Sequence, residues 1–273
     1  MDRTDVAIVV NTCPKFFYLL ESFFGLLRRY GSECKWPVYL ATEKPEDFMV
    51  QLVVKKYDVN LLVLAEEDAD FMDSRLAAIK ALPSEIQYVL PLQEDFLLER
   101  PGLNYTALRQ ALEILDADIR VQSLRLMPCP GSSGRGNIIL GGWQRLTAED
   151  MKFCYQATLW RRQLYTDFFQ QLITQCLQNN PTLRKGTAEY NIFSVRGNPA
   201  ENHQGQYLMN SLAPGAQHLC WPRKATWANA VYWCPWPYRP TAVVRGNFEA
   251  WAYEYVRREG FSIAPPLPPL PPT

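Results

Sequence analysis

Apolar and polar blocks alternate along the first third of the chain in a way that predicts repeated β-α-β units. Residues 6–10 form an unbroken apolar, mostly β-branched run, which is typical of a buried strand. Residues 16–30 have the apolar spacing of a helix, and residues 46–57 have a similar pattern. Residues 37–42 and 61–64 are the next expected strands. The repeated rhythm predicts an α/β fold with a mixed, mainly parallel, Rossmann-like sheet flanked by helices.

The rest of the chain continues this pattern and then becomes less regular. The further expected elements are a helix over 73–82, a strand over 88–92, a helix over 105–115, a strand over 121–127 and a long amphipathic helix over 158–177. Residues 200–240 form an irregular, aromatic C-terminal region. We expect one domain over residues 1–263, with a donor half of about 1–127 and an acceptor half of about 128–263. Residues 264–273 are an extended, proline-rich tail.

The most informative segment is the strand over residues 88–92, because it leads directly into two adjacent acids, Glu94 and Asp95. Ligands of open α/β sheets bind outside the carboxyl ends of the strands, so acids at this place suit a metal ion or a polyphosphate. Side chains of neighbouring residues on extended backbone point to opposite faces, so we expect one of the two as a direct ligand. Acid pairs also cap helices, and that explanation stays open.

Polar residues follow the first strand as well. Asn11, Thr12 and Lys15 are candidates for contacts with a nucleotide, although an ordinary helix start explains this turn equally well. The turn lacks the glycine pattern of a phosphate-cradling loop, which disfavours P-loop kinases and dinucleotide-dependent dehydrogenases. Asp73 and Arg75 form a second polar group, and a helix N-cap is the alternative explanation for Asp73.

Later in the chain, two charged residues are candidates for catalysis. Glu189 lies in a polar break between two helical stretches, where a carboxylate could serve as a general base, and a plain surface acid is the alternative. Arg245 follows the expected strand over residues 241–244 and could neutralise a leaving diphosphate, with a salt bridge at the sheet edge as the alternative. His203 and His218 lack metal-ligand spacing, and a Gly-x-Ser-x-Gly elbow is absent, so zinc chemistry and hydrolase triads lack support.

Composition narrows the range of partners. The 273 residues carry 28 basic and 28 acidic side chains, so the formal net charge of zero argues against binding of nucleic acid through bulk electrostatics. The seven cysteines are widely spaced and suggest neither a disulfide framework nor a zinc ribbon, which favours a cytoplasmic location. We expect no transmembrane segment and no leader peptide, because the sequence shows neither a span-length apolar window nor a basic n-region.

Five segments together resemble a family of GT-A-type glycosyltransferases found in bacterial surface-polysaccharide clusters and in large algal viruses. They are residues 6–12, the helix from Asp73, residues 92–96, the region of Glu189 and residues 243–246. The resemblance implies a nucleotide-sugar lying across the carboxyl ends of the first strands, with a divalent ion at an Asp-x-Asp-like motif. Asp95 would then be the metal ligand and Glu94 its neighbour in the motif.

The same resemblance makes Glu189 the candidate base and places Arg75 and Arg245 near the donor. This sequence has Gln93-Glu94-Asp95 where the family has Asp-x-Asp, which implies a reduced or absent metal requirement as the alternative.

The sequence therefore predicts a glycosyltransferase that moves a sugar from a nucleoside diphosphate sugar to a hydroxyl of a glycan, with inversion and with Mn²⁺ or Mg²⁺ at Asp95. Trp227 and Trp233 are expected to line the acceptor site, since indole rings stack on sugar C–H faces, and core packing is their alternative. Two other functions stay open, a sugar nucleotidyltransferase and a non-catalytic glycan-binding protein. The proline-rich tail is a candidate ligand for another protein.

Overall fold

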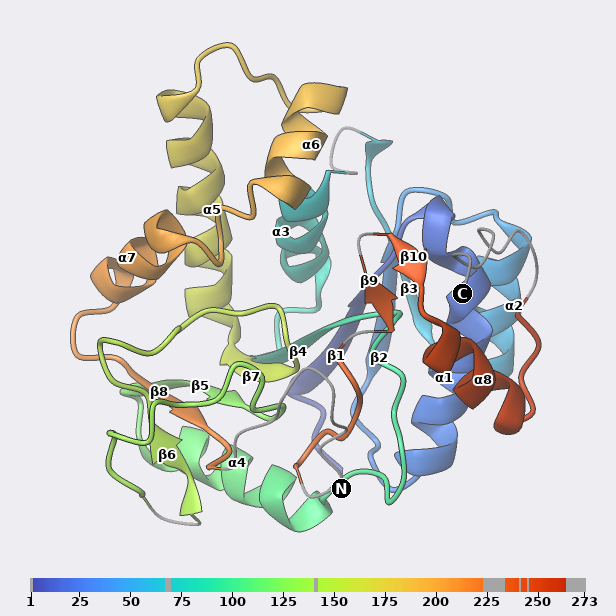
Figure 1. The fold of residues 1–273 in the computed structure, drawn as a ribbon, viewed down its shortest axis with the longest axis horizontal. Coiled ribbons are helices and arrows are strands. Elements are labelled where there is room, and N and C mark those ends of the chain that lie inside the picture. The colour runs from blue at the N-terminus through green and yellow to red at the C-terminus, as the bar shows by residue number, and fades with distance from the viewer. Residues whose placement is uncertain are drawn as a thin grey trace.

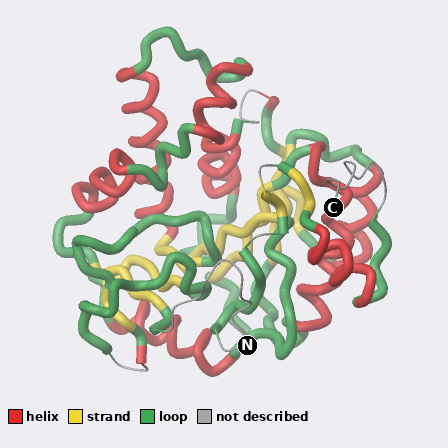
Figure 2. Tube along the Cα trace, in the orientation of Figure 1, coloured by secondary structure: helices red, strands yellow, loops and turns green. Residues whose placement is uncertain are grey.

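The computed structural model describes residues 2–66, 70–139, 142–222, 234–240, 242–244 and 246–263. An eight-stranded sheet runs through the molecule, with helices on both of its faces (Figures 1 and 2). Its strands are β1 (Val6–Asn11), β2 (Val38–Thr42), β3 (Asn60–Val63), β4 (Tyr88–Gln93), β5 (Val121–Arg125), β6 (Gln144–Arg145), β7 (Thr158–Arg161) and β8 (Gln217–Cys220). A separate hairpin consists of β9 (Val243–Val244) and β10 (Asn247–Phe248).

The helices follow the strands in the expected alternation. They are α1 (Leu20–Tyr30), preceded by a 3-10 turn at Pro14–Leu19, then α2 (Phe48–Tyr57), α3 (Phe71–Ala81), α4 (Tyr105–Ala117), α5 (Arg162–Asn179), α6 (Ala188–Arg196), α7 (His203–Leu212) and α8 (Ala250–Arg258). In the part of the chain that the structure describes, none of these helices is both long and apolar enough to cross a bilayer.

The order of the strands across the sheet is β3-β2-β1-β4-β7-β5-β8-β6. The first four run parallel to one another, and so do β5 and β8. The strands β7 and β6 run antiparallel to their neighbours. The predicted α/β fold with a mixed, mainly parallel sheet is therefore confirmed.

The core lies on both faces of the sheet, as the alternation along β1 shows. Val6, Ile8 and Val10 belong to one apolar cluster, together with side chains of α1, α2, α4 and α8. Ala7 and Val9 belong to the other, together with side chains of α3, α5, α6 and α7. A strand that is covered on both faces needs apolar residues at every position, which explains why this run is continuous. Burying one large apolar side chain contributes about 1.5–3 kcal/mol.

Some predicted elements in the second half were wrong. The segment over 158–177 was expected to be one helix, but its first four residues form β7 and the helix α5 begins at Arg162. Leu159 and Trp160 of β7 are fully or almost fully buried, each in the apolar cluster on one face of the sheet. A short buried strand and a helix start can share the same apolar spacing, so periodicity alone did not separate them.

Two more regions differ from the prediction. Residues 200–240, expected to be irregular, contain α7 and β8. The helix expected over 16–30 begins as a 3-10 turn at Pro14–Leu19 and becomes α-helical only at Leu20. Pro14 occupies the first position of this turn, where its missing N–H and fixed φ angle are tolerated.

Candidate functional site

The two predicted polar turns meet at one edge of the sheet. Strand β1 continues to β2 on one side, whereas β4 lies on its other side, so the strand order reverses between β1 and β4. Asn11 and Gln93 are register partners at the ends of these two parallel strands. The residues that follow them therefore lie at the switch point of the sheet, where open α/β folds bind ligands.

Glu94 and Asp95 come directly after β4 and lie in a turn, not on the extended backbone that the sequence suggested. Glu94 is only 6% exposed. Burial, and then the negative charge of Asp95, raises the pKa of Glu94 to about 8. Burial also raises the pKa of Asp95 to about 6. A cation bound beside these two carboxyls would favour their ionised forms.

We call Glu94 and Asp95 the acid pair. The groups around it come from the end of β1, the 3-10 turn, the β9–β10 hairpin and α3. Thr12 and Cys13 follow β1, and Tyr18 lies on the 3-10 turn. Burial, and then the nearby charge of Glu94, raises the pKa of Cys13 to about 12. Burial likewise raises the pKa of Tyr18, with Glu94 and Asp95 adding to the effect. The Thr12 hydroxyl lowers the pKa of Glu94 slightly, although it does not reach hydrogen-bond geometry with any described residue.

The hairpin of β9 and β10 lies next to the end of β4 (Figure 1), and Val243 of β9 acts on Asp95. The backbone N–H of Val243 donates to the Asp95 carboxyl and lowers its pKa. Gly246 has a φ angle of +80°, and a Cβ there would lie 2.5 Å from the ammonium nitrogen of Lys15. Phe248 and Tyr18 make an edge-to-face ring contact at 6.0 Å. Lys15, which follows β1, therefore lies against the hairpin at Gly246.

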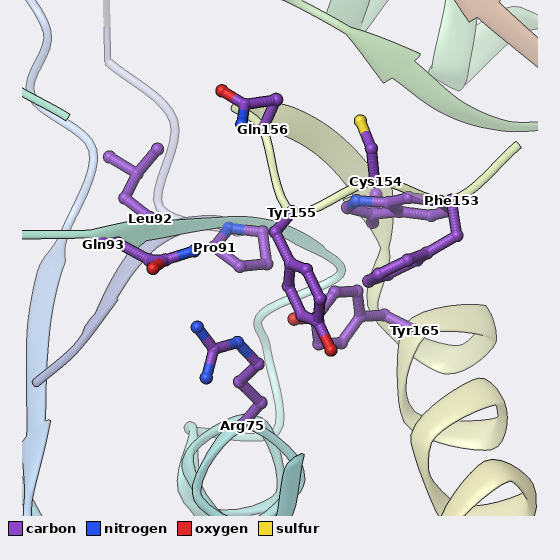
Figure 3. Close-up of a pocket in the computed structure, with 10 residues that line it drawn as sticks. Arg75, Pro91, Leu92, Gln93, Phe153, Cys154, Tyr155, Gln156 and Tyr165 are labelled. Carbon is purple, nitrogen blue, oxygen red and sulfur yellow. The ribbon is translucent and has the colours of Figure 1, made fainter. Parts of the chain in front are cut away.

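Arg75 approaches the same edge from α3 and is 5% exposed. Figure 3 shows its guanidinium directed toward the end of β4, beside the ring of Tyr155. It donates to the Phe71 carbonyl at 2.7 Å, and its guanidinium carbon lies 5.0 Å from the Tyr155 ring centroid. Its positive charge lowers the pKa of both Glu94 and Asp95. A guanidinium fixed at this place can also face an anionic group of a substrate.

A small cavity separates Arg75 from the sheet. Gln93, Tyr155 and Gln156 are among its lining residues, and its free volume is about 10 Å³. That volume corresponds to about one water molecule. The buried Tyr155 hydroxyl lacks a hydrogen-bond partner among the described residues. The cavity is thus too small for a substrate and belongs to the packing beneath the site.

Asn11 and Asp73 are both engaged in contacts within the protein. Asn11 donates through its side-chain amide to the Ser74 carbonyl at 3.0 Å, which ties the end of β1 to α3. Asp73 accepts from the Tyr190 hydroxyl at 2.7 Å and pairs with Lys185. Asp73 lies in the first turn of α3, and Asp70 precedes that helix, so the N-cap explanation for Asp73 is wrong. Asp73 joins α3 to the α6 region, and its donor-binding role stays a prediction.

The sequence predicted that Glu189 lies in a break between helices, but the structure places it in the first turn of α6. Its side chain is exposed, whereas the next residue, Tyr190, is fully buried against Asp73. Thr187 caps the helix by accepting from the Tyr190 N–H at 3.2 Å. Among the described residues, neither hydrogen bond nor ion pair joins Glu189 to the acid pair. Its role as a base stays a prediction.

Three predicted site residues, Arg245, Trp227 and Trp233, lie outside the described residues. The proline-rich tail, over residues 264–273, lies outside them as well. The immediate neighbours of Arg245, Val244 and Gly246, belong to the β9–β10 hairpin.

The acid pair fits a divalent cation of the Mg²⁺ or Mn²⁺ type. The described residues contain no group of three or more His, Cys, Asp or Glu side chains that could hold a metal ion. These two cations use one or two carboxylates and complete their shell with water and substrate phosphates, so a larger protein cluster is not required. Asp95 Oδ1 is buried and has no hydrogen-bond partner among the described residues, which leaves it available as a ligand.

Two tyrosines, Tyr18 beside the acid pair and Tyr155 beside Arg75, were not predicted from the sequence. Tyr18 lies on a turn whose apolar spacing indicates only core packing. Tyr155 lies in a segment without helix or strand, and its neighbour Phe153 is a core residue. Because both reach the site only through the packing of distant segments, local sequence carries no signal for them.

Comparison with known proteins finds similarity of fold alone. No protein-family model matches the chain, and no curated protein matches it in sequence. Among solved structures, residues 1–349 of Staphylococcus aureus TarS in complex with UDP-GlcNAc are 15% identical, with a TM-score of 0.44. The alignment covers 81% of this chain and 57% of that one.

Two further structures show the same level of similarity. The galactosyltransferase LgtC, solved with donor and acceptor sugar analogues, is 9% identical over 78% of this chain and 72% of that one, with a TM-score of 0.42. A 4-diphosphocytidyl-2C-methyl-D-erythritol synthase from Anaerococcus prevotii is 13% identical over 72% of this chain and 99% of that one, with a TM-score of 0.40. These values describe a partial likeness of shape, so the function rests on the residues of this chain.

Proposed function

We propose that this chain is a glycosyltransferase that moves a sugar from a nucleoside diphosphate sugar to a hydroxyl of a glycan acceptor, with metal assistance and with inversion. The observation that supports it is the acid pair at the switch point of the sheet, with Glu94 buried and Asp95 half-buried. Glu94 and Asp95 have raised pKa values, and Arg75 is the nearby cation that acts on both. A site that is acidic when empty suits a ligand that brings a cation together with a diphosphate.

The proposed reaction is a single displacement. The acceptor oxygen bonds to the anomeric carbon, the bond from that carbon to the phosphate oxygen breaks, and the nucleoside diphosphate leaves with the electron pair. The hydroxyl proton passes to a carboxylate base, a role that we assign to Glu189 from the sequence. Arg75 faces the negative charge that develops on the leaving diphosphate. A divalent cation held by Asp95 would neutralise the same charge.

The test is a thermal-shift panel of UDP, GDP, CMP and dTDP, each with and without Mn²⁺. A ligand at 100 times its Kd stabilises the native state by about 2.7 kcal/mol, which corresponds to a Tm increase of roughly 5–10 °C for a protein of this size. We expect such a shift for one nucleotide, larger with Mn²⁺ than without it.

Asp95→Asn is the decisive variant, and Glu66→Gln is its matched control. Glu66 follows β3, the edge strand of the same parallel half of the sheet, and its side chain is 77% exposed. We expect Asp95→Asn to abolish the Mn²⁺-dependent part of the shift and Glu66→Gln to retain it. Absence of any nucleotide shift, or release of pyrophosphate from a nucleoside triphosphate and a sugar phosphate, would overturn the proposal. The second result would instead identify a nucleotidyltransferase.

A further inference from the structure

A second, larger pocket lies at the other end of α1. Its volume is about 450 Å³, and Arg29, Arg100 and Arg258 line it together with Glu99, Tyr255 and Glu259. Arg29 is in the last turn of α1, whereas the 3-10 turn before α1 adjoins the acid pair. An α-helix rises about 1.5 Å per residue, so the length of α1, roughly 15 Å, separates the two places. The pocket is distinct from the site described above.

Two of its arginines are fixed by one small network. Glu259, whose side chain is 7% exposed, accepts from Arg29 at 2.9 Å. The Tyr30 hydroxyl donates to Glu259 at 2.6 Å and accepts from Arg100 Nε at 3.0 Å. Because Arg29 and Arg100 are held through the same two groups, their guanidiniums lose little freedom when a ligand binds.

The charges of the pocket do not cancel. Glu259 forms an ion pair with Arg29. Glu99 forms an ion pair at 3.2 Å with Arg239, which does not line the pocket. Within the described ranges, neither Arg100 nor Arg258 forms an ion pair with a carboxylate. Arg258 lies 5.5 Å from the ring of Tyr255, whose own hydroxyl donates to the Leu98 carbonyl. Glu259 acts on the charge of Arg100 without forming an ion pair with it, and among the described residues Arg100 donates only through Nε. The Arg258 guanidinium and the remaining N–H groups of Arg100 are thus left for an anion.

We propose that this pocket binds a small molecule that carries a phosphate or diphosphate group. Guanidiniums present a planar fork of N–H donors that matches phosphate oxygens, and two of them facing one cavity suit a group with two or more negative charges. The volume lies within the range of small-molecule sites, so it also accommodates an organic part attached to the phosphate. Tyr255, which is 4% exposed, contributes an aromatic wall.

The probe for this site is inorganic pyrophosphate, titrated by calorimetry at constant ionic strength, with sulfate as the reference anion. The variants are Arg100→Gln and Arg258→Gln. Arg257→Gln is the matched control, because Arg257 is exposed in the same last turn of α8 but does not line the pocket. Arg75→Gln reports any pyrophosphate that binds at the acid pair, so this test stands apart from the proposed transferase function.

We expect Arg100→Gln and Arg258→Gln each to weaken pyrophosphate binding roughly ten- to hundredfold, the range of charge-assisted hydrogen bonds. Arg257→Gln and Arg75→Gln should retain this binding event, and sulfate should bind more weakly than pyrophosphate. Unchanged affinity in both pocket variants, an equal loss in Arg257→Gln, or no binding to the wild-type chain would each overturn the proposal. The side chains changed in Arg100→Gln, Arg258→Gln and Arg257→Gln are exposed, whereas Arg75 is buried. Unchanged Tm values without ligand verify that all four variants fold.

Discussion

Asp73 is buried and Asp95 is half-buried with a buried Oδ1 atom; both lie near the carboxyl ends of the parallel strands, but their surroundings differ. Asp73 meets the ammonium group of Lys185 and the hydroxyl of Tyr190. Asp95 meets backbone amides, including that of Val243, and the acid Glu94. A buried carboxylate with its own cation stabilises the fold, whereas one without a paired cation is costly until a ligand supplies the charge. Asp73 therefore has the surroundings of a structural acid, whereas Asp95 has the surroundings that we expect of the proposed metal ligand.

The largest expected effect is on activity. Asp95→Asn should lower kcat/KM at least 100-fold, about 2.7 kcal/mol of transition-state stabilisation, because it removes the charge that would hold the cation. The same change should leave stability unchanged or raise it, since it removes one of two adjacent carboxyls whose pKa values are raised. Transfer assays and urea unfolding measure the two effects. Full activity at saturating Mn²⁺ would contradict the functional assignment of Asp95.

The opposite result is expected for the structural acid. Asp73→Asn should destabilise the protein by about 1–3 kcal/mol, because the Tyr190 hydroxyl and Lys185 lose a charged partner. The loss is kept below that of a fully buried ion pair because Lys185 is 42% exposed. Urea unfolding of Asp73→Asn beside Asp95→Asn gives the comparison directly. Equal stability of the two variants would remove the distinction between the acids.

His218 provides a pH-dependent control from another part of the sheet. It lies on β8, and its Nδ1 is 2.8 Å from the Ser123 hydroxyl. Burial, and then the charges of Lys152 and Arg125, lowers the pKa of His218 to about 3. The unfolded chain therefore binds more protons below pH 6.5, so stability is present above that pH and is lost as the pH falls toward 3.

Between pH 7 and pH 5 this effect amounts to about 2 kcal/mol at most. His218→Gln should reduce the decrease in unfolding free energy over that interval without changing nucleotide binding. Urea unfolding of the wild-type chain and of His218→Gln at the two pH values measures this decrease. A decrease of the same size in the variant would show that other groups cause the acid sensitivity.

The smallest effect should come from the cation that pairs with Asp73. Lys185→Gln should destabilise the protein by about 0.5–1 kcal/mol, because a half-exposed lysine contributes little beyond its screened charge. Tyr190 still donates to Asp73 in this variant. Thermal unfolding at low and high salt measures the destabilisation caused by Lys185→Gln. A loss of stability larger than that of Asp73→Asn would show that Lys185 has a further role.

The sequence predicted the parallel half of the fold because its signals are local. The run over residues 6–10 is apolar at every position, and β1 is indeed covered on both faces. The predicted strand over 88–92 and β4 agree to within one residue. The segment over 158–177 failed because β7 and α5 share one apolar pattern, and only pairing with β4 and β5 makes its first residues a strand.

What the sequence determined by itself is that acids follow one strand and polar groups follow another, because strand ends are visible in the apolar pattern. Tertiary structure alone decided that β1 and β4 are neighbours, that Glu94 is buried and that Asp73 already has a cation. Burial and pairing depend on segments such as α3, α6 and the β9–β10 hairpin, which are distant in sequence. The charge state of a carboxylate is set by these neighbours through desolvation and Coulomb interaction, and only the folded chain brings them together.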